Sequence, residues 1–147
     1  NLNTIATELE CEVYIGKNKF FGIIDRIDKM SNGLYEIYDY KTGKKHMSNK
    51  EAKNNLQLAL YHMALNEKYS DCNQVSLNWY YLRTNKIVTV SHNKKQLEEL
   101  KNHLLKRIKM INLEKKFEAK ESLLCHWCYF WKECEIKIQD NPAYQLS

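Results

Sequence analysis

An aspartate and a lysine stand at a spacing that suits chemistry on a charged substrate. Asp39 and Lys41 lie in residues 33–43, where tyrosines and an isoleucine favour a β-strand with a glycine at each end. Because side chains alternate between the two faces of a strand, Asp39 and Lys41 point to the same face, about 6–7 Å apart. A carboxylate and an ammonium group so placed can hold a cation and a phosphate side by side.

A second aspartate is expected to face Asp39 across a β-hairpin. Residues 20–28 are another predicted strand that contains Asp25, and the Asn32-Gly33 pair between the two strands is a strong hairpin signal. If the turn centres on Asn32, antiparallel pairing places Asp25 opposite Asp39. Opposed like charges destabilise a sheet, so this arrangement favours a divalent cation between the carboxylates. A shifted register that leaves Asp25 in solvent is the alternative.

The elements that must position these residues follow from periodicity and capping signals. Residues 5–15, 75–82 and 86–90 are predicted strands. Ser48 opens a capping box and a predicted helix that runs to about residue 69, with an apolar stripe of Leu56, Ala59, Leu60, Met63 and Ala64. A long helix is predicted over residues 94–116. This order predicts an α/β protein with helices on a central mixed sheet.

Three short motifs carry a resemblance to a known family. Gly22-x-x-Asp25-Arg26-x-Asp28, Asp39-Tyr40-Lys41-Thr42-Gly43 and Gln57-x-x-x-Tyr61 follow one another in the order that resembles the PD-(D/E)XK nuclease superfamily, specifically its RecB-like branch. That branch includes AddB nuclease domains and CRISPR-associated RecB-like exonucleases. The resemblance implies a restriction-endonuclease-like core that hydrolyses phosphodiester bonds in DNA. It further implies an exonuclease that prefers single-stranded DNA or DNA ends, in repair, recombination, or CRISPR or phage DNA processing.

The resemblance also implies roles for individual residues. Catalytic roles are expected for Asp25, Asp39, Lys41, Gln57 and Tyr61. Mg²⁺ or Mn²⁺ would be bound by Asp25, Asp39 and the backbone of Tyr40, with Glu8 or Glu10 as a further ligand that the spacing does not choose between. Lys41 would orient or help to deprotonate the attacking water. Contacts with DNA are expected from Arg26, Lys44 and Lys45, although a solvated loop is an equal alternative for the two lysines.

The family's first helix, which carries a His or Glu that completes the metal shell, has no counterpart here. The first histidine is His46, and the sequence begins with Asn1 rather than Met. We therefore expect either that an N-terminal helix is missing from this chain or that this branch does without it. A helicase or another domain upstream and a cytoplasmic location, or the host cytoplasm for a viral protein, are further expectations.

A cysteine-rich segment follows the predicted nuclease core. Within a single domain, residues 1–120 are expected to form the core and residues 121–147 to carry Cys-x2-Cys-x5-Cys, a spacing typical of thiolate ligands. The resemblance implies a structural 4Fe–4S cluster on Cys125, Cys128 and Cys134, with a fourth cysteine upstream that neither Cys11 nor Cys72 matches in position. Zinc bound by the three cysteines with His126 or another ligand is the alternative.

Composition and motifs together leave three classes of protein open. The net charge of +5 is compatible with a nucleic-acid partner, and no apolar run approaches the roughly 20 residues of a membrane span. The chain is expected to be a metal-dependent DNA nuclease, a non-catalytic DNA-binding relative or a zinc-stabilised interaction domain. The presence of Asp25, Asp39 and Lys41 favours the nuclease, and the missing first-helix residue favours the non-catalytic relative.

Overall fold

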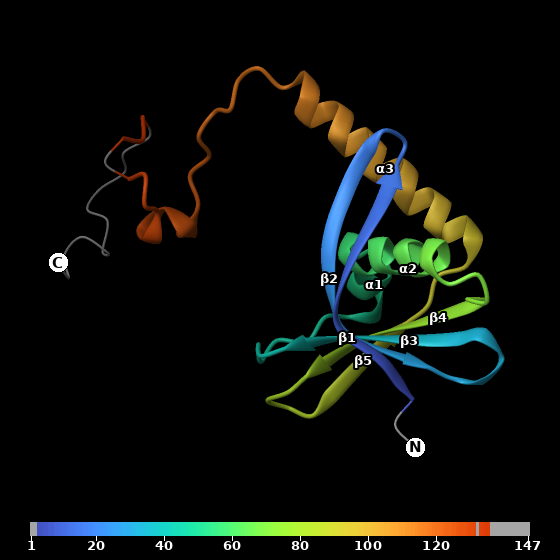
Figure 1. The fold of residues 1–147 in the computed structure, drawn as a ribbon. Helices are drawn as coiled ribbons and strands as arrows, with labels where there is room; N and C mark the ends of the chain where they lie inside the picture. Colours follow the sequence, from blue (N-terminus) through green and yellow to red (C-terminus); the bar gives the residue numbers. More distant parts are fainter. Residues whose placement is uncertain (1–2, 132, 136–147) are drawn as a thin grey trace. The chain divides into compact units, whose positions relative to one another are not determined.

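A five-stranded mixed β-sheet organises the first of two compact units (Figure 1). The computed structural model describes residues 3–131 and 133–135 of the 147-residue chain. The units comprise residues 1–109 and 110–147, and the division of a single domain after residue 120 stays a prediction. The strands follow one another across the sheet in chain order: β1 (Thr4–Ile15), β2 (Asn18–Lys29), β3 (Leu34–Lys41), β4 (Gln74–Tyr81) and β5 (Lys86–Val90). The predicted α/β fold of restriction-endonuclease-like type is confirmed.

Strands β2 and β3 form the predicted hairpin. Their antiparallel register, in which Arg26 pairs with Tyr38, is centred on Asn32. Asn32 and Gly33 have φ values of 58° and 72°, a left-handed conformation that asparagine and glycine adopt at least cost. A Cβ atom at Gly33 would lie 2.3 Å from the carbonyl oxygen of Asp71, so this position requires glycine. The turn therefore fixes the register that sets the two aspartates opposite each other.

Strand β3 pairs in parallel with β4, and the two are joined through a pair of helices, α1 (Asn49–Lys53) and α2 (Leu56–Lys68). Ser48 caps α1 with the predicted capping box. The expectation of one continuous helix is wrong, because Asn55 acts as a second N-cap: its side chain accepts a hydrogen bond from the backbone N–H of Leu58 at 3.1 Å. This break starts α2 beside the sheet, with its first turn close to β3.

Helix α2 contacts the sheet on one side and α3 (Lys94–Leu113) on another. Its fully buried residues are Leu58, Ala59, Tyr61, His62, Ala64 and Leu65. The predicted stripe is therefore only partly correct: Leu60 and Met63 are half-buried and pack in a smaller cluster with Leu104 and Leu105 of α3. The apolar surface of α2 is divided between two neighbours, so a single stripe does not describe it. Helix α3 ends before the predicted residue 116, and no helix in the described part of the chain is long and apolar enough to cross a membrane.

Two histidines are buried in the core without having been predicted there. His62 on α2 is 4% exposed and His92, which follows β5, is 7% exposed. Their ring centres are 6.1 Å apart, and His92 Nε2 donates to the carbonyl oxygen of Lys53 at 2.8 Å. Burial, with a smaller electrostatic contribution from the nearby His92 ring, lowers the pKa of His62 to about 4. Between pH values of about 4 and 6.5, His62 is therefore mostly neutral in the folded protein and mostly protonated in the unfolded chain.

We expect the protein to lose stability as the pH falls from about 6.5 to about 4. In this window the unfolded chain protonates His62 and the folded protein does not, which removes up to about 3 kcal/mol of unfolding free energy. Urea unfolding at several pH values measures the slope. His62→Gln should flatten it, whereas His103→Gln, at an exposed position on α3, should leave it unchanged. An unchanged slope in His62→Gln would contradict the assignment.

Candidate active site

Asp25 and Asp39 meet on the helix-covered face of the hairpin. The register that pairs Arg26 with Tyr38, continued by one residue, sets Asp25 opposite Asp39, as predicted. Asp39 is 4% exposed. Asp25 Oδ2 accepts a hydrogen bond from the backbone N–H of Tyr40 at 2.8 Å, which holds its carboxylate against β3. The two acids are thus fixed by the hairpin backbone itself.

Asp39 is a buried carboxylate with two partners. Its Oδ2 forms an ion pair with Lys41 Nζ, and its Oδ1 accepts a hydrogen bond from Gln57 Nε2 at 3.3 Å. Burial raises the pKa of Asp39; Lys41 lowers it and the charge of Asp25 raises it further. Burial is the largest of these effects, and Lys41 is the cationic neighbour of Asp39.

Gln57 and Tyr61 reach the site from the first two turns of α2. Gln57 Nε2 donates to Tyr61 Oη at 3.1 Å as well as to Asp39, and Tyr61 Oη donates to the carbonyl oxygen of Ile23 at 2.6 Å. The spacing of four residues puts both side chains on one face of the helix. Tyr61 is also 7% exposed and belongs to the core. The two predicted residues therefore lie at the site, where Tyr61 fixes the amide that contacts Asp39.

The glycine of the first motif has a steric role in this arrangement. A Cβ atom at Gly22 would lie 2.9 Å from Cε1 of Tyr61, whereas a Cβ atom at Gly43 would meet nothing within 4 Å. The Tyr61 ring is held by its hydrogen bonds and cannot move without moving Gln57. Gly22 is thus the position at which β2 allows α2 to approach closely.

We expect Gly22→Ala to displace Tyr61 and with it the Gln57 amide. The overpacked site should cost about 1–3 kcal/mol of unfolding free energy and lower any activity that depends on Gln57. Gly43→Ala, in open space, is the matched control and should change neither. Thermal unfolding and activity of the two variants measure the difference, and equal behaviour of both would show that the close approach at Gly22 is not required.

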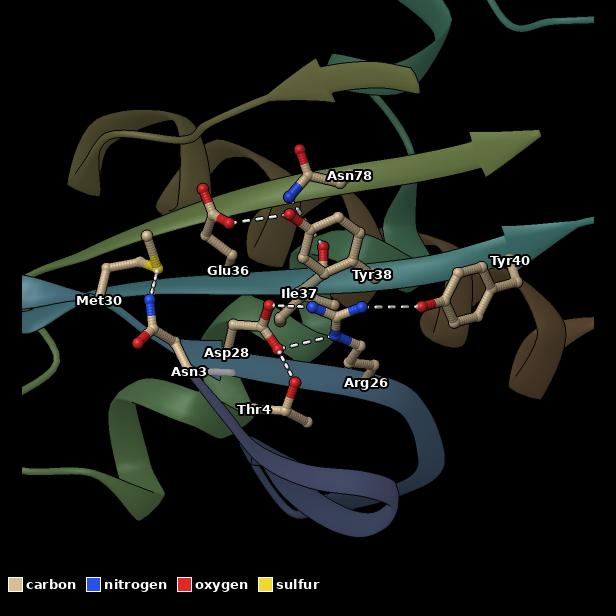
Figure 2. Close-up of polar contacts among 10 residues, drawn as sticks. All are labelled: Asn3, Thr4, Arg26, Asp28, Met30, Glu36, Ile37, Tyr38, Tyr40 and Asn78. Atoms are coloured by element: carbon tan, nitrogen blue, oxygen red, sulfur yellow. Dashed lines mark hydrogen bonds and ion pairs between the residues drawn. The ribbon is translucent and has the colours of Figure 1, made fainter. Parts of the chain in front are cut away.

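Arg26 points to the opposite face of the sheet, since neighbouring residues of a strand alternate. Its guanidinium binds both carboxylate oxygens of Asp28, with Nε to Oδ1 at 2.7 Å, and lies 4.8 Å from the centre of the Tyr38 ring (Figure 2). Nη1 donates to Tyr40 Oη at 3.4 Å, and Thr4 Oγ1 donates to Asp28 Oδ1 at 2.8 Å. The structure gives Arg26 internal partners, and its contact with DNA stays a prediction.

Two hollows with basic linings adjoin the site. One, of about 330 Å³, is lined by Lys41 and Lys45. The other, of about 580 Å³, is lined by Gln57 and by two cations that the sequence did not single out, Lys50 and Arg107. Both hollows share Met47 and Glu51 in their walls, and Lys44 is exposed on the same loop as Lys45. A lysine in a first helical turn and an arginine on a distant helix form no local pattern, so only the fold brings them together.

Glu8 does not join the two aspartates in a three-acid group. Within residues 3–131 and 133–135, no three His, Cys, Asp or Glu side chains lie close enough to hold a metal ion. Glu8 is exposed on β1 and has a left-handed φ of 49°; Glu10 is exposed as well. Glu8 as a ligand therefore stays a prediction, as does the backbone of Tyr40, whose N–H group binds Asp25.

The cysteine-rich segment belongs to the second unit, and its described part includes a 3₁₀ turn, Leu123–Trp127. The backbone N–H of Ser122 donates to Cys125 Sγ at 3.3 Å, and the N–H of Cys128 donates to the carbonyl oxygen of Cys125 at 3.2 Å. Cys125, Cys128 and Cys134 all lie in the described part of the chain and form no ligand group there. The side chain of His126 lies outside the described residues. The cluster and the zinc alternative both stay predictions.

Comparison with known proteins places the chain in a family. The family model of the PD-(D/E)XK nuclease superfamily matches residues 2–135, and the chain belongs to that superfamily. This range contains the acid pair, Lys41 and the Gln57–Tyr61 pair. No curated protein matches the sequence.

Solved structures share the fold at low sequence identity. The crystal structure of SSO0001 is 17% identical with a TM-score of 0.53, and the match covers 95% of this chain and 64% of that one. A Eubacterium rectale protein provisionally described as an exonuclease is 13% identical with a TM-score of 0.52, over 97% of this chain and 56% of that one. This chain thus spans less than two thirds of the length of either protein. At these identities the likeness shows the fold alone.

Proposed function

We propose that this chain is a metal-dependent DNA nuclease of the RecB-like branch and acts as an exonuclease on single-stranded DNA or DNA ends. The observation that carries the proposal is the buried pairing of Asp39 with Lys41, opposite Asp25 on the neighbouring strand. Membership of the nuclease superfamily supports the same reaction class.

The donor set fits a hard divalent cation. Asp25 and Asp39 offer carboxylate oxygens, the hard ligands that such cations prefer, on adjacent strands. Burial, and to a lesser degree the charge of Asp25, raises the pKa of Asp39, and a cation held by both acids would relieve that repulsion. Mg²⁺ or Mn²⁺ would be held by these two acids and, when bound, would lower the pKa of a water and neutralise charge on the phosphate. Asp25 and Asp39 are thus the side-chain ligands that we assign to the cation.

The side chains around the acids have complementary tasks. Lys41, which is partly exposed and paired with Asp39, can donate to a phosphate oxygen as negative charge develops and can orient the attacking water. Gln57 fixes the orientation of Asp39 through Oδ1, and Tyr61 fixes Gln57 in turn. The positions of the nucleophile and of the phosphate are therefore set by groups that are themselves held by hydrogen bonds.

The basic hollows support DNA as the substrate. Lys45 and Lys41 line one of the two hollows, and Lys50, Arg107 and Gln57 line the other, so cations line the same hollows as two residues of the site. A phosphate backbone bound along them would reach Lys41 without passing an unscreened carboxylate, because Glu51 is tied to the backbone and hydroxyl of Ser48. Lys44 and Arg26 are further proposed contacts.

End-labelled single- and double-stranded DNA with Mn²⁺ tests the proposal. Cleavage that requires both the metal and Asp39 would support it, and the order of product lengths distinguishes exonuclease from endonuclease action. DNA binding without cleavage would instead identify a non-catalytic DNA-binding relative.

We propose, secondly, that Cys125, Cys128 and Cys134 are ligands of a structural 4Fe–4S cluster, with zinc as the alternative metal. Their spacing supports thiolate ligation. Anaerobic purification with metal analysis tests the assignment. Iron, sulfide and a visible absorption band are expected for the cluster, whereas colourless protein with one zinc would support the alternative.

A further inference from the structure

An apolar pocket between helix α2 and the paired strands β1 and β2 (the β1–β2 ribbon) is separated from Asp39 by one side chain, Gln57. Its volume is about 340 Å³, which is in the range of small-ligand sites. Aromatic and apolar side chains, among them Phe20, Phe21, Leu60 and Cys11, form most of its lining. The described lining residues with polar side-chain groups other than a thiol are Gln57 and Tyr61. The lining is thus suited to an uncharged group, and its aromatic side chains can stack on a ring.

The pocket and the proposed reaction centre share a wall. Gln57 lines the pocket and donates its amide hydrogen to Asp39 Oδ1 at 3.3 Å. Tyr61, the second shared residue, is held by the carbonyl oxygen of Ile23. A group seated in the pocket therefore lies one side chain away from the buried carboxylate.

Charge differs sharply between the hollows that meet at Gln57. The 580 Å³ hollow on its other side contains Lys50 and Arg107, whereas the apolar pocket contains no Lys, Arg, Asp or Glu among its described lining residues. A polynucleotide is complementary to these two hollows, because its phosphates are anionic and its bases are uncharged and aromatic. A phosphate on the basic side and a base on the apolar side would place the intervening backbone at Asp39.

We propose that the apolar pocket binds one unpaired nucleobase of the DNA strand whose phosphate is bound at the acid pair. The inference deepens the proposed nuclease function and rests on it for the identity of the strand. Phe21 is 60% exposed and offers an aromatic face to the base. A base in a duplex is stacked and paired, so occupancy of the pocket requires a single strand or a frayed end. The pocket thereby gives a structural origin for a preference for unpaired DNA.

Equilibrium binding in EDTA tests the proposal without any cleavage. The probes are a fluorescent single-stranded oligonucleotide and the same oligonucleotides carrying one abasic residue at successive positions. We expect one abasic position to weaken binding by about tenfold, the effect of losing one base–aromatic stack. Phe21→Leu, which keeps an apolar side chain, should bind the intact and abasic probes almost equally. Tyr14→Leu is the matched control, since Tyr14 is a 55% exposed aromatic on the same ribbon outside this pocket.

Two results would overturn the pocket assignment: binding that is indifferent to every abasic position, or a base dependence that survives in Phe21→Leu. Failure of the nuclease proposal has a different signature, namely the absence of cleavage that depends on metal and Asp39. Base-dependent binding lost in Phe21→Leu, in a protein that does not cleave, would support the pocket and overturn the nuclease. Cleavage with no role for Phe21 or for any base would overturn the pocket alone.

Discussion

Asp39→Asn should abolish metal-dependent DNA cleavage, with a loss of at least about three orders of magnitude in rate. The substitution keeps the shape of the side chain and removes the charge that pairs with Lys41 and would hold the cation. Single-turnover cleavage of single-stranded DNA in Mn²⁺ measures the loss. A thermal shift supplies an independent readout: Mn²⁺ should stabilise the native protein and leave the melting temperature of the variant unchanged.

Asp28→Asn is the control for this experiment. Asp28 is also buried, at 5% exposure, but it lies on the other face of the sheet and binds Arg26 and Thr4. Its replacement should lower stability, because Arg26 loses a charged partner, and should leave cleavage per folded molecule near the native value. Equal loss of cleavage in both variants would show that the effect of Asp39→Asn comes from the fold and not from the site.

Lys41→Ala should reduce cleavage by about 10²- to 10⁴-fold while the affinity for DNA changes little. These factors are typical for loss of a group that transfers a proton or stabilises charge in the transition state. Lys41 is partly exposed, so its removal leaves no cavity in the core, and Asp39 keeps its hydrogen bond from Gln57. Single-turnover rates and Kd values in Ca²⁺, measured on the same oligonucleotide, separate chemistry from binding.

Lys44→Ala and Lys45→Ala provide the comparison for Lys41→Ala. Both side chains are exposed on the loop after β3, so their loss should weaken DNA binding and reduce its dependence on salt without changing the rate of the bound complex. A Lys41→Ala protein that cleaves at the native rate would show that Lys41 has no catalytic role. A loss confined to affinity would assign Lys41 to the same phosphate-binding surface as its neighbours.

The sequence contained enough to predict the acid pair. Period-two alternation placed Asp39 and Lys41 on one face, and the Asn32-Gly33 turn fixed the register that sets Asp25 opposite Asp39. Both signals are local, because a hairpin turn determines the pairing of the strands on either side of it. The Gln57–Tyr61 spacing predicted a shared helix face, while only the structure shows that Tyr61 is held by Ile23.

Features that depend on distant contacts could not be read from the sequence. No sequence pattern singles out His62, and its burial near His92 arises from the packing of α2 on the chain segment after β5. Arg26 is a different case: its partner Asp28 is two residues away on the same strand face, so alternation alone could have indicated this contact. The apolar pocket requires the β1–β2 ribbon and α2 at their actual separation.

The parallel pairing of β3 with β4 has a consequence for the order of folding. Asp25 and Asp39 are brought together by a hairpin of neighbouring strands, whereas β4 pairs with β3 only after the chain has crossed through α1 and α2, the segment that also carries Gln57. Closing the short loop costs less entropy than closing the long one. We therefore expect transition-state φ-values to be higher at the β2–β3 turn than along β4, and the reverse order would contradict this view. On that account the β2–β3 hairpin with its two aspartates forms first, and the packing of the later elements then removes Asp39 from water.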